Sequence, residues 1–187
     1  MKFFLPVILV PMFAFGQAPS GVAAEWDISR TVETLSAQAK RLKPILDQLT
    51  PQEWISKGAP AAYVPQWRSA EDELGFLIDS ASALEKQPDR LTAVLDTYFR
   101  FQSLETRLQS LIEGVRKYQN PAVGDLMLGV LGENSSNRDK LRQYITELAA
   151  TKEKEFQIMD QEAQRCRGTL NRQPSLPKKK PEQKPNE

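Results

Sequence analysis

The chain has 187 residues, with 25 basic and 24 acidic side chains, one cysteine and no histidine. Without histidine it lacks the usual ligand of zinc and haem and the usual base of serine and cysteine nucleophiles. We therefore expect no catalytic residue, no metal site and no cofactor. A nearly neutral chain is also not expected to bind nucleic acid, which requires a strong basic field.

Residues 1–24 have the pattern of a secretory signal peptide. A basic residue, Lys2, precedes an apolar run over residues 3–15, and small residues follow up to Ala24. At about 1.5 Å per residue, this run is too short to span a hydrocarbon core roughly 30 Å thick. We expect cleavage after Ala24, with Gly16 as the alternative point. The mature protein should then be exported, periplasmic or extracellular, without a transmembrane span.

The rest of the pattern predicts an all-α domain over residues 25–172, with periodicity near 3.6 in every long segment. We expect an antiparallel helical bundle with coiled-coil-like seams, built from four long helices and two short ones. In the first long helix, residues 28–49, apolar residues alternate in steps of four and three. Pro44 removes a backbone hydrogen bond, so it should kink this helix. The seam positions are Ile28, Val32, Leu35, Ala39, Leu42, Leu46 and Leu49.

Capping and turn residues predict where three further helices begin and end. The segment Thr50–Glu53 reads as a capping box with proline at the first helical position, and it predicts a short helix that ends at Gly58. A second long helix is expected over residues 60–86. The tight connection that follows forces a third long helix, over residues 89–118, to return antiparallel.

The region after residue 120 predicts a short helix over residues 122–131, a break rich in glycine, asparagine and serine, and a fourth long helix over residues 137–168. One uninterrupted helix over residues 121–168 is the alternative. It would be about 70 Å long, far longer than its partners, so we favour the break. The inward positions expected of the last helix are Leu141, Ile145, Leu148, Phe156, Met159, Ala163 and Cys166.

Residues 173–187 differ in composition from the helical region. They contain four prolines and four lysines, and Leu176 is their only apolar residue. Such a segment cannot bury enough apolar surface to offset the entropy lost on ordering. It is predicted to be a disordered tail.

The short helix over residues 122–131 is the first candidate for a partner-binding site, because apolar residues surround most of it. Its glycines lower helix propensity by about 1 kcal/mol each relative to alanine. A buried core helix is the simpler interpretation. The functional alternative is a mobile flap that docks on a partner through Leu126, Met127, Leu128 and Leu131.

Cys166, the only cysteine of the sequence, lies between two arginines, Arg165 and Arg167. It could join two chains through an intermolecular disulfide, giving a homodimer, or act as a reactive thiol. The simpler interpretation is a small buried residue on the inner face of the last helix, where a lone cysteine behaves as a hydrophobe.

Two groups of side chains invite both a functional and a structural interpretation. Glu105 lies beside an apolar seam, but pairing with a neighbouring basic residue is favoured over a role as a general acid. Residues 71–73 are consecutive carboxylates that diverge around a helix, so they indicate a solvated face. Four aromatic residues predict either a ligand pocket or, preferably, core packing: Trp26, Trp54, Tyr63 and Trp67.

Together these patterns predict an exported, non-enzymatic helical protein. The long seams favour a structural or protein-interaction module of the cell envelope, whose protein partner is unknown. The alternative is a small-ligand or lipid carrier with a cavity between its helices.

Overall fold

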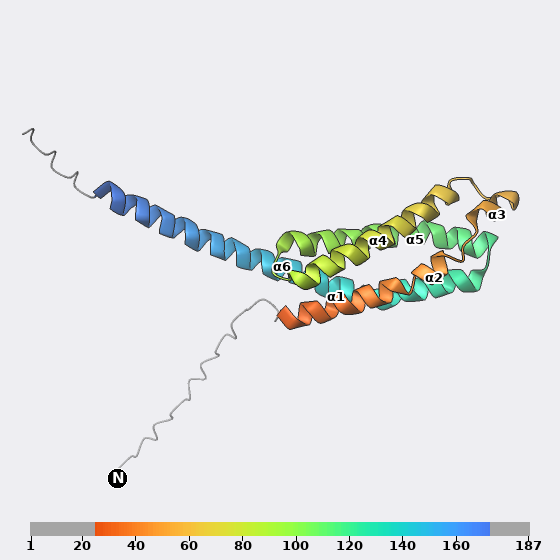
Figure 1. Ribbon diagram of the computed structural model, residues 1–187, viewed down its shortest axis with the longest axis horizontal. Coiled ribbons are helices and arrows are strands. Elements are labelled where there is room, and N and C mark those ends of the chain that lie inside the picture. The colour runs from red at the N-terminus through yellow and green to blue at the C-terminus, as the bar shows by residue number, and fades with distance from the viewer. Residues whose placement is uncertain (1–24, 173–187) are drawn as a thin grey trace, which may run out of the picture.

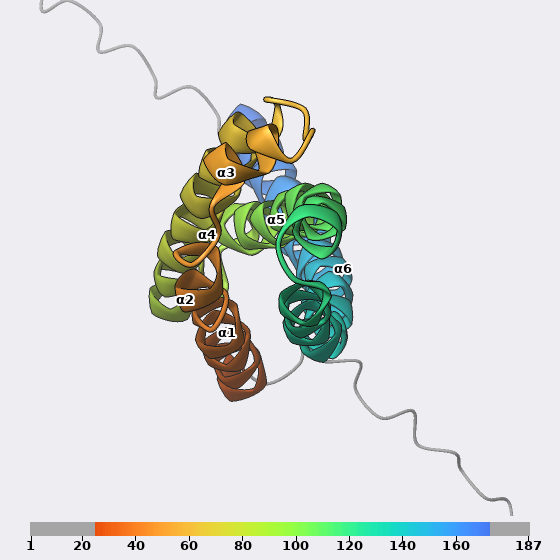
Figure 2. The ribbon, with the colours of Figure 1, turned by 90° about the vertical axis from the view of Figure 1, so that its right-hand side faces the viewer.

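The computed structural model describes residues 25–172; the predicted signal peptide (1–24) and tail (173–187) lie outside the described residues. This part of the chain is helical and contains no strand. Four long helices surround one axis, as the end-on view in Figure 2 shows, and two short helices join the first two of them (Figure 1). The elements are α1 (Glu25–Lys40), α2 (Lys43–Leu46), α3 (Pro51–Ser56), α4 (Tyr63–Lys86), α5 (Leu91–Tyr118) and α6 (Pro121–Arg172).

Each long helix packs antiparallel against its neighbours around the bundle. The contacts run from α1 to α4, from α4 to α5, from α5 to α6 and from α6 back to α1. Short connections between α4 and α5 and between α5 and α6 require each following helix to reverse direction. The predicted all-α antiparallel bundle is therefore confirmed.

The predicted seam of the first helix is confirmed at each of its seven apolar positions, which are 3% exposed or less. The predicted kink at Pro44 is instead an interruption. α1 ends at Lys40, the amide of Leu42 bonds to the carbonyl of Ala39 at 2.9 Å, and the chain resumes as α2 at Lys43. Proline lacks the amide that would continue the helix, so a tight turn replaces a bend.

The predicted short helix after Thr50 is present as α3, and it ends in a left-handed glycine. Gly58 has φ +87°, a conformation that costs little only for glycine. The amide of Ala59 then bonds to the carbonyl of Trp54 at 3.0 Å, which satisfies an end carbonyl of α3. This reversal aims the chain back towards the start of α4.

The predicted break at residues 132–137 is wrong, because α6 is one helix of 52 residues. Asn134 and Asn137, which read as turn residues, lie at inward positions and are 1% and 7% exposed. The side-chain amide of Asn137 donates to Oε1 of Gln38 on α1 at 2.9 Å. This bond to α1, together with the bonds of Asn134 to Val130 and Asn137 within α6, outweighs the weak helix propensity of the segment.

Polar residues separate the bundle core into two apolar clusters. On α6, Asn134 and Asn137 lie between Leu131 in one cluster and Leu141 in the other. Thr97 of α5 is also fully buried between the clusters, and its hydroxyl donates to the carbonyl of Ala93. Among the described residues, every buried side-chain nitrogen or oxygen has a hydrogen-bond partner.

A substitution at Gly132 tests whether α6 is continuous. It is helical, and nothing lies within 4 Å of the position that a Cβ would occupy. Gly132→Ala should therefore raise the free energy of unfolding by about 0.5–1 kcal/mol, measured by urea denaturation. A left-handed turn at this residue would instead make the substitution destabilising.

Gly114→Ala is the matched contrast. It offers the same gain in helix propensity, but its Cβ would lie 2.6 Å from Cε1 of Tyr63. This clash with a packed ring should lower the free energy of unfolding.

Candidate functional site

The C-terminal part of α6 extends beyond the bundle as an isolated helix (Figure 1). Up to Leu170, Leu148 is the last buried residue of α6, and every residue from 153 to 170 is exposed. We call residues 153–170 the projecting helix. At about 1.5 Å per residue it is roughly 27 Å long. It projects because α5 begins at Leu91 and α4 ends at Lys86, so neither helix continues beside it.

Apolar side chains form a stripe along this projecting helix. Phe156, Met159 and Leu170 are 74%, 66% and 67% exposed. With Ala163 and Cys166 they recur in steps of three and four, so they lie along one face. We call these five residues the projecting stripe. Contiguous exposed apolar patches are typical of interaction surfaces, so the projecting stripe is the candidate site of this chain.

The sequence-based placement of these residues was wrong in one respect. Phe156, Met159, Ala163 and Cys166 were expected to face the bundle core, and Cys166 was expected to be buried. All four are exposed, and Cys166 is a free thiol. Their spacing correctly indicated a helical stripe, but spacing does not specify whether a partner helix extends far enough to cover it.

The projecting helix carries its charges unevenly. Residues 153–162 contain four carboxylates and one lysine, whereas residues 163–170 contain two arginines and no carboxylate. An ion pair between Lys152 and Glu155, 3.2 Å apart, lies at its base. Residues with good helix propensity dominate the segment, which helps an isolated helix to persist.

A shallow hollow lies where the projecting stripe meets the bundle. It is open to solvent and combines the start of α5 with the base of the projecting helix. Leu91 contributes from α5 and Phe156 contributes the first aromatic ring of the projecting stripe. The lining residues are Leu91, Ala149, Lys152, Glu153, Phe156 and Gln157.

The four residues predicted as a partner site at the start of α6 do not form one surface. Met127 and Leu131 are buried in the core, at 0% and 5% exposure. Leu126 and Leu128 are about half exposed, but they flank Met127 on opposite sides because successive helical residues are about 100° apart. Since α6 is continuous here, the segment is not a separate flap.

Three of the four predicted aromatic residues belong to the larger apolar cluster of the core: Trp54, Tyr63 and Trp67. Trp54 is fully buried, and its Nε1 donates to Oε1 of Gln119 at 3.0 Å. The ring of Tyr63 meets those of Trp54 and Tyr118 edge to face. Trp26 lies at the start of α1, at the other end of the bundle from α3 (Figure 1), so the predicted cluster of four does not form.

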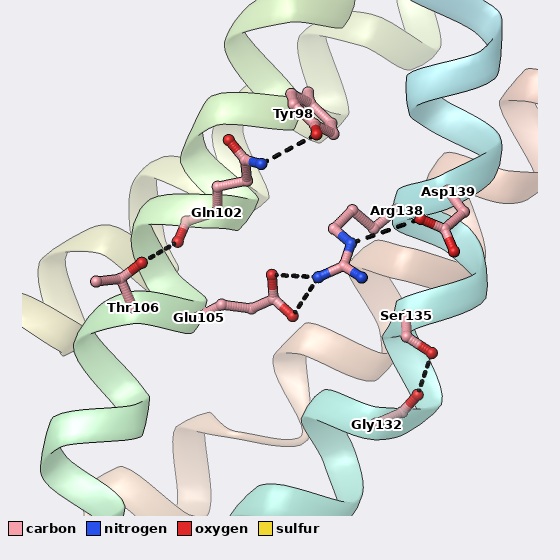
Figure 3. A network of polar contacts seen from close by, with 8 residues as sticks. All are labelled: Tyr98, Gln102, Glu105, Thr106, Gly132, Ser135, Arg138 and Asp139. Carbon is pink, nitrogen blue, oxygen red and sulfur yellow. Dashed lines mark hydrogen bonds and ion pairs between the residues drawn. The ribbon is translucent and has the colours of Figure 1, made fainter.

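The predicted pairing of Glu105 is confirmed. Nη1 of Arg138 lies 2.9 and 3.1 Å from the two carboxylate oxygens of Glu105, and this bond ties α5 to α6 (Figure 3). Donation to this carboxylate raises the pKa of the Arg138 guanidinium. The contact is therefore a structural ion pair and leaves no uncompensated acid.

The three carboxylates of residues 71–73 differ from the expected solvated face. Glu73 is buried, and its oxygens lie 3.4 Å from Nη1 of Arg100 and 3.6 Å from Nε of Arg107. Burial, together with the nearby Asp47, raises the pKa of Glu71. Sequence alone indicated that the three side chains diverge, but not that two arginines of α5 face one of them.

Comparisons of the chain with protein-family models, curated proteins and solved structures gave no match. Each helix of the described region is too short or too polar to cross a bilayer. Within residues 25–172, no three carboxylate or thiol side chains gather to hold a metal ion. The geometry of the projecting helix is therefore the main evidence on function.

A pair of adjacent residues tests the packing at the start of α6. Met127→Ala should lower the free energy of unfolding by about 2–5 kcal/mol, because it removes a fully buried side chain. Leu128→Ala should change it by less than about 1 kcal/mol, because this side chain is 47% exposed. Equal losses in urea denaturation would contradict this orientation of α6.

Proposed function

We propose that this chain is an exported, non-enzymatic protein that binds a helix of a partner chain in the cell envelope through the projecting stripe. The observation that carries the proposal is the exposure of five aligned side chains on a helix that no part of the bundle covers. Apolar residues at three- and four-residue steps are suited to docking against another helix. Export is inferred from the basic and apolar pattern of residues 1–24.

The packing of the bundle supports this proposal, because the bundle anchors the projecting helix. Large side chains such as Phe101, Leu104 and Leu108 are at most 1% exposed, and ion pairs join α4 to α5 and α5 to α6. A firmly packed base holds the projecting helix in a defined direction. This division of labour suits a structural or interaction module.

The alternative of a small-ligand or lipid carrier requires an enclosed, largely apolar cavity. The hollow along the middle of α6 differs from such a cavity, because it is open and most of its lining is polar or charged. Its lining residues are Ser135, Ser136, Asp139, Lys140, Arg142, Gln143, Thr146 and Glu147. The core side chains described above also fill the space between the helices. We therefore favour the interaction module.

Site-specific photo-crosslinking in intact cells tests the proposal. A photoreactive phenylalanine analogue would replace Met159 on the projecting stripe or, as the control, Gln161 on the far side of the helix. Both positions are exposed, so neither substitution should disturb the fold. We expect at least about tenfold more cross-linked protein from position 159, because a helix docked on one face contacts only that face.

Two results would contradict the proposal. Equal cross-linking from both positions would indicate random collisions, and none from position 159 would leave the projecting stripe without a partner. The mass of the purified protein checks export separately. If the purified chain retains residues 1–24 or remains in the cytoplasmic fraction, the proposed location in the cell envelope is wrong.

A further inference from the structure

We propose that the projecting stripe binds the same stripe of a second copy of this chain, with the two projecting helices side by side and antiparallel. This inference rests on the proposed function, because it names the partner of the same surface. Three features of the described residues favour this occupant: the spacing of the stripe, the order of its large and small side chains, and the distribution of its charges.

The spacing requires a partner helix with the same repeat. Steps of three and four give an average apolar repeat of about 3.5 residues. Two helices that both have this repeat keep their stripes in contact along their length by supercoiling around each other. Going back towards the bundle, Lys152, Ala149 and Ile145 continue the same steps. A second copy necessarily has this repeat and presents the same length of exposed helix.

The order of side-chain sizes favours the antiparallel arrangement. If the two segments overlap fully from Lys152 to Leu170, Gln161 lies at their midpoint. Phe156 of one copy then faces Cys166 of the other, and Met159 faces Ala163. Both of these layers set a large side chain against a small one, which fills space evenly. A parallel pair would instead place two phenylalanines in one layer and two alanines in another.

The charges of the projecting helix also favour this direction. When the two helices are antiparallel, the acidic part of one copy, residues 153–162, lies beside the arginine-containing part of the other copy, residues 163–170. Glu153 of one copy then lies near Arg167 of the other, and symmetry repeats this pair. Antiparallel helices also oppose their dipoles. A parallel pair would bring the acidic parts together.

The hollow at the base of the projecting helix accommodates the end of the second copy. Full overlap places Leu170 of the second copy beside Lys152, at the hollow that Leu91 and Ala149 also line. This contact adds the start of α5 to the interface. About 18 residues from each copy make a small interface, so we expect reversible association with a dissociation constant in roughly the micromolar range.

Sedimentation equilibrium of the full mature chain tests whether the projecting stripe mediates self-association. The variant Phe156→Ser with Met159→Ser alters two exposed residues, so the bundle should remain folded, which circular dichroism checks. We expect its dissociation constant to rise at least about tenfold, the effect of a loss of about 1.4 kcal/mol. The matched control, Gln161→Ser with Gln164→Ser, changes the opposite face and should leave dimerisation unchanged.

Cross-linking with a short bis-maleimide tests the direction of the pair. Asp160 lies next to the midpoint, so Asp160→Cys in a Cys166→Ser background should give a covalent dimer. The native Cys166 residues of the two copies would lie ten residues apart along the axis, about 15 Å, and should not be joined. The reverse pattern would indicate a parallel pair and overturn the proposal.

A wild-type protein that remains monomeric at about 1 mM would also overturn it, since even a weak specific dimer forms at that concentration. This failure is distinguishable from failure of the proposed function. If the protein is monomeric but position 159 still cross-links to a different envelope protein, the projecting stripe is an interaction surface whose partner is not a second copy.

Discussion

The bond between Asn137 of α6 and Gln38 of α1 fixes the alignment on which the bundle depends. Apolar seams tolerate a shift by one repeat, because leucine packs against leucine in either register. A buried amide does not, because any shift separates it from its partner and leaves a polar group without a hydrogen bond. Thr97 and Asn134 lie in the same zone between the two apolar clusters, and the pair of Glu105 and Arg138 adds an ionic tie from α5 to α6.

Once α6 is aligned in this way, its length determines what it exposes. α6 has 52 residues and α5 has 28, and the turn at residues 119–120 joins the end of α5 to the start of α6. The excess therefore emerges at the other end of the bundle, where α4 turns into α5 (Figure 1). The exposed stripe follows from this mismatch and needs no special local structure.

The seams of α1, α4 and α5 could be predicted from spacing alone, because apolar side chains at three- and four-residue steps have few other arrangements. Two errors concerned α6. Asn134 and Asn137 resemble turn residues until their partners on α1 and α6 are known, and length was taken as evidence against a continuous helix. The side chains from Phe156 to Cys166 follow the same spacing as core residues. Their exposure depends on where other helices end, which no local pattern of α6 encodes.

The absence of a hinge between Leu148 and Phe156 has a geometric consequence. A continuous helix transmits rotation, so each residue turns the next side chain by about 100° around the helix axis. Removing a single residue from this interval would leave the bundle intact but rotate the projecting stripe by more than a quarter turn relative to it. The number of residues between Leu148 and Phe156 therefore sets the rotation of the bundle about the axis of α6, relative to a partner bound on the projecting stripe.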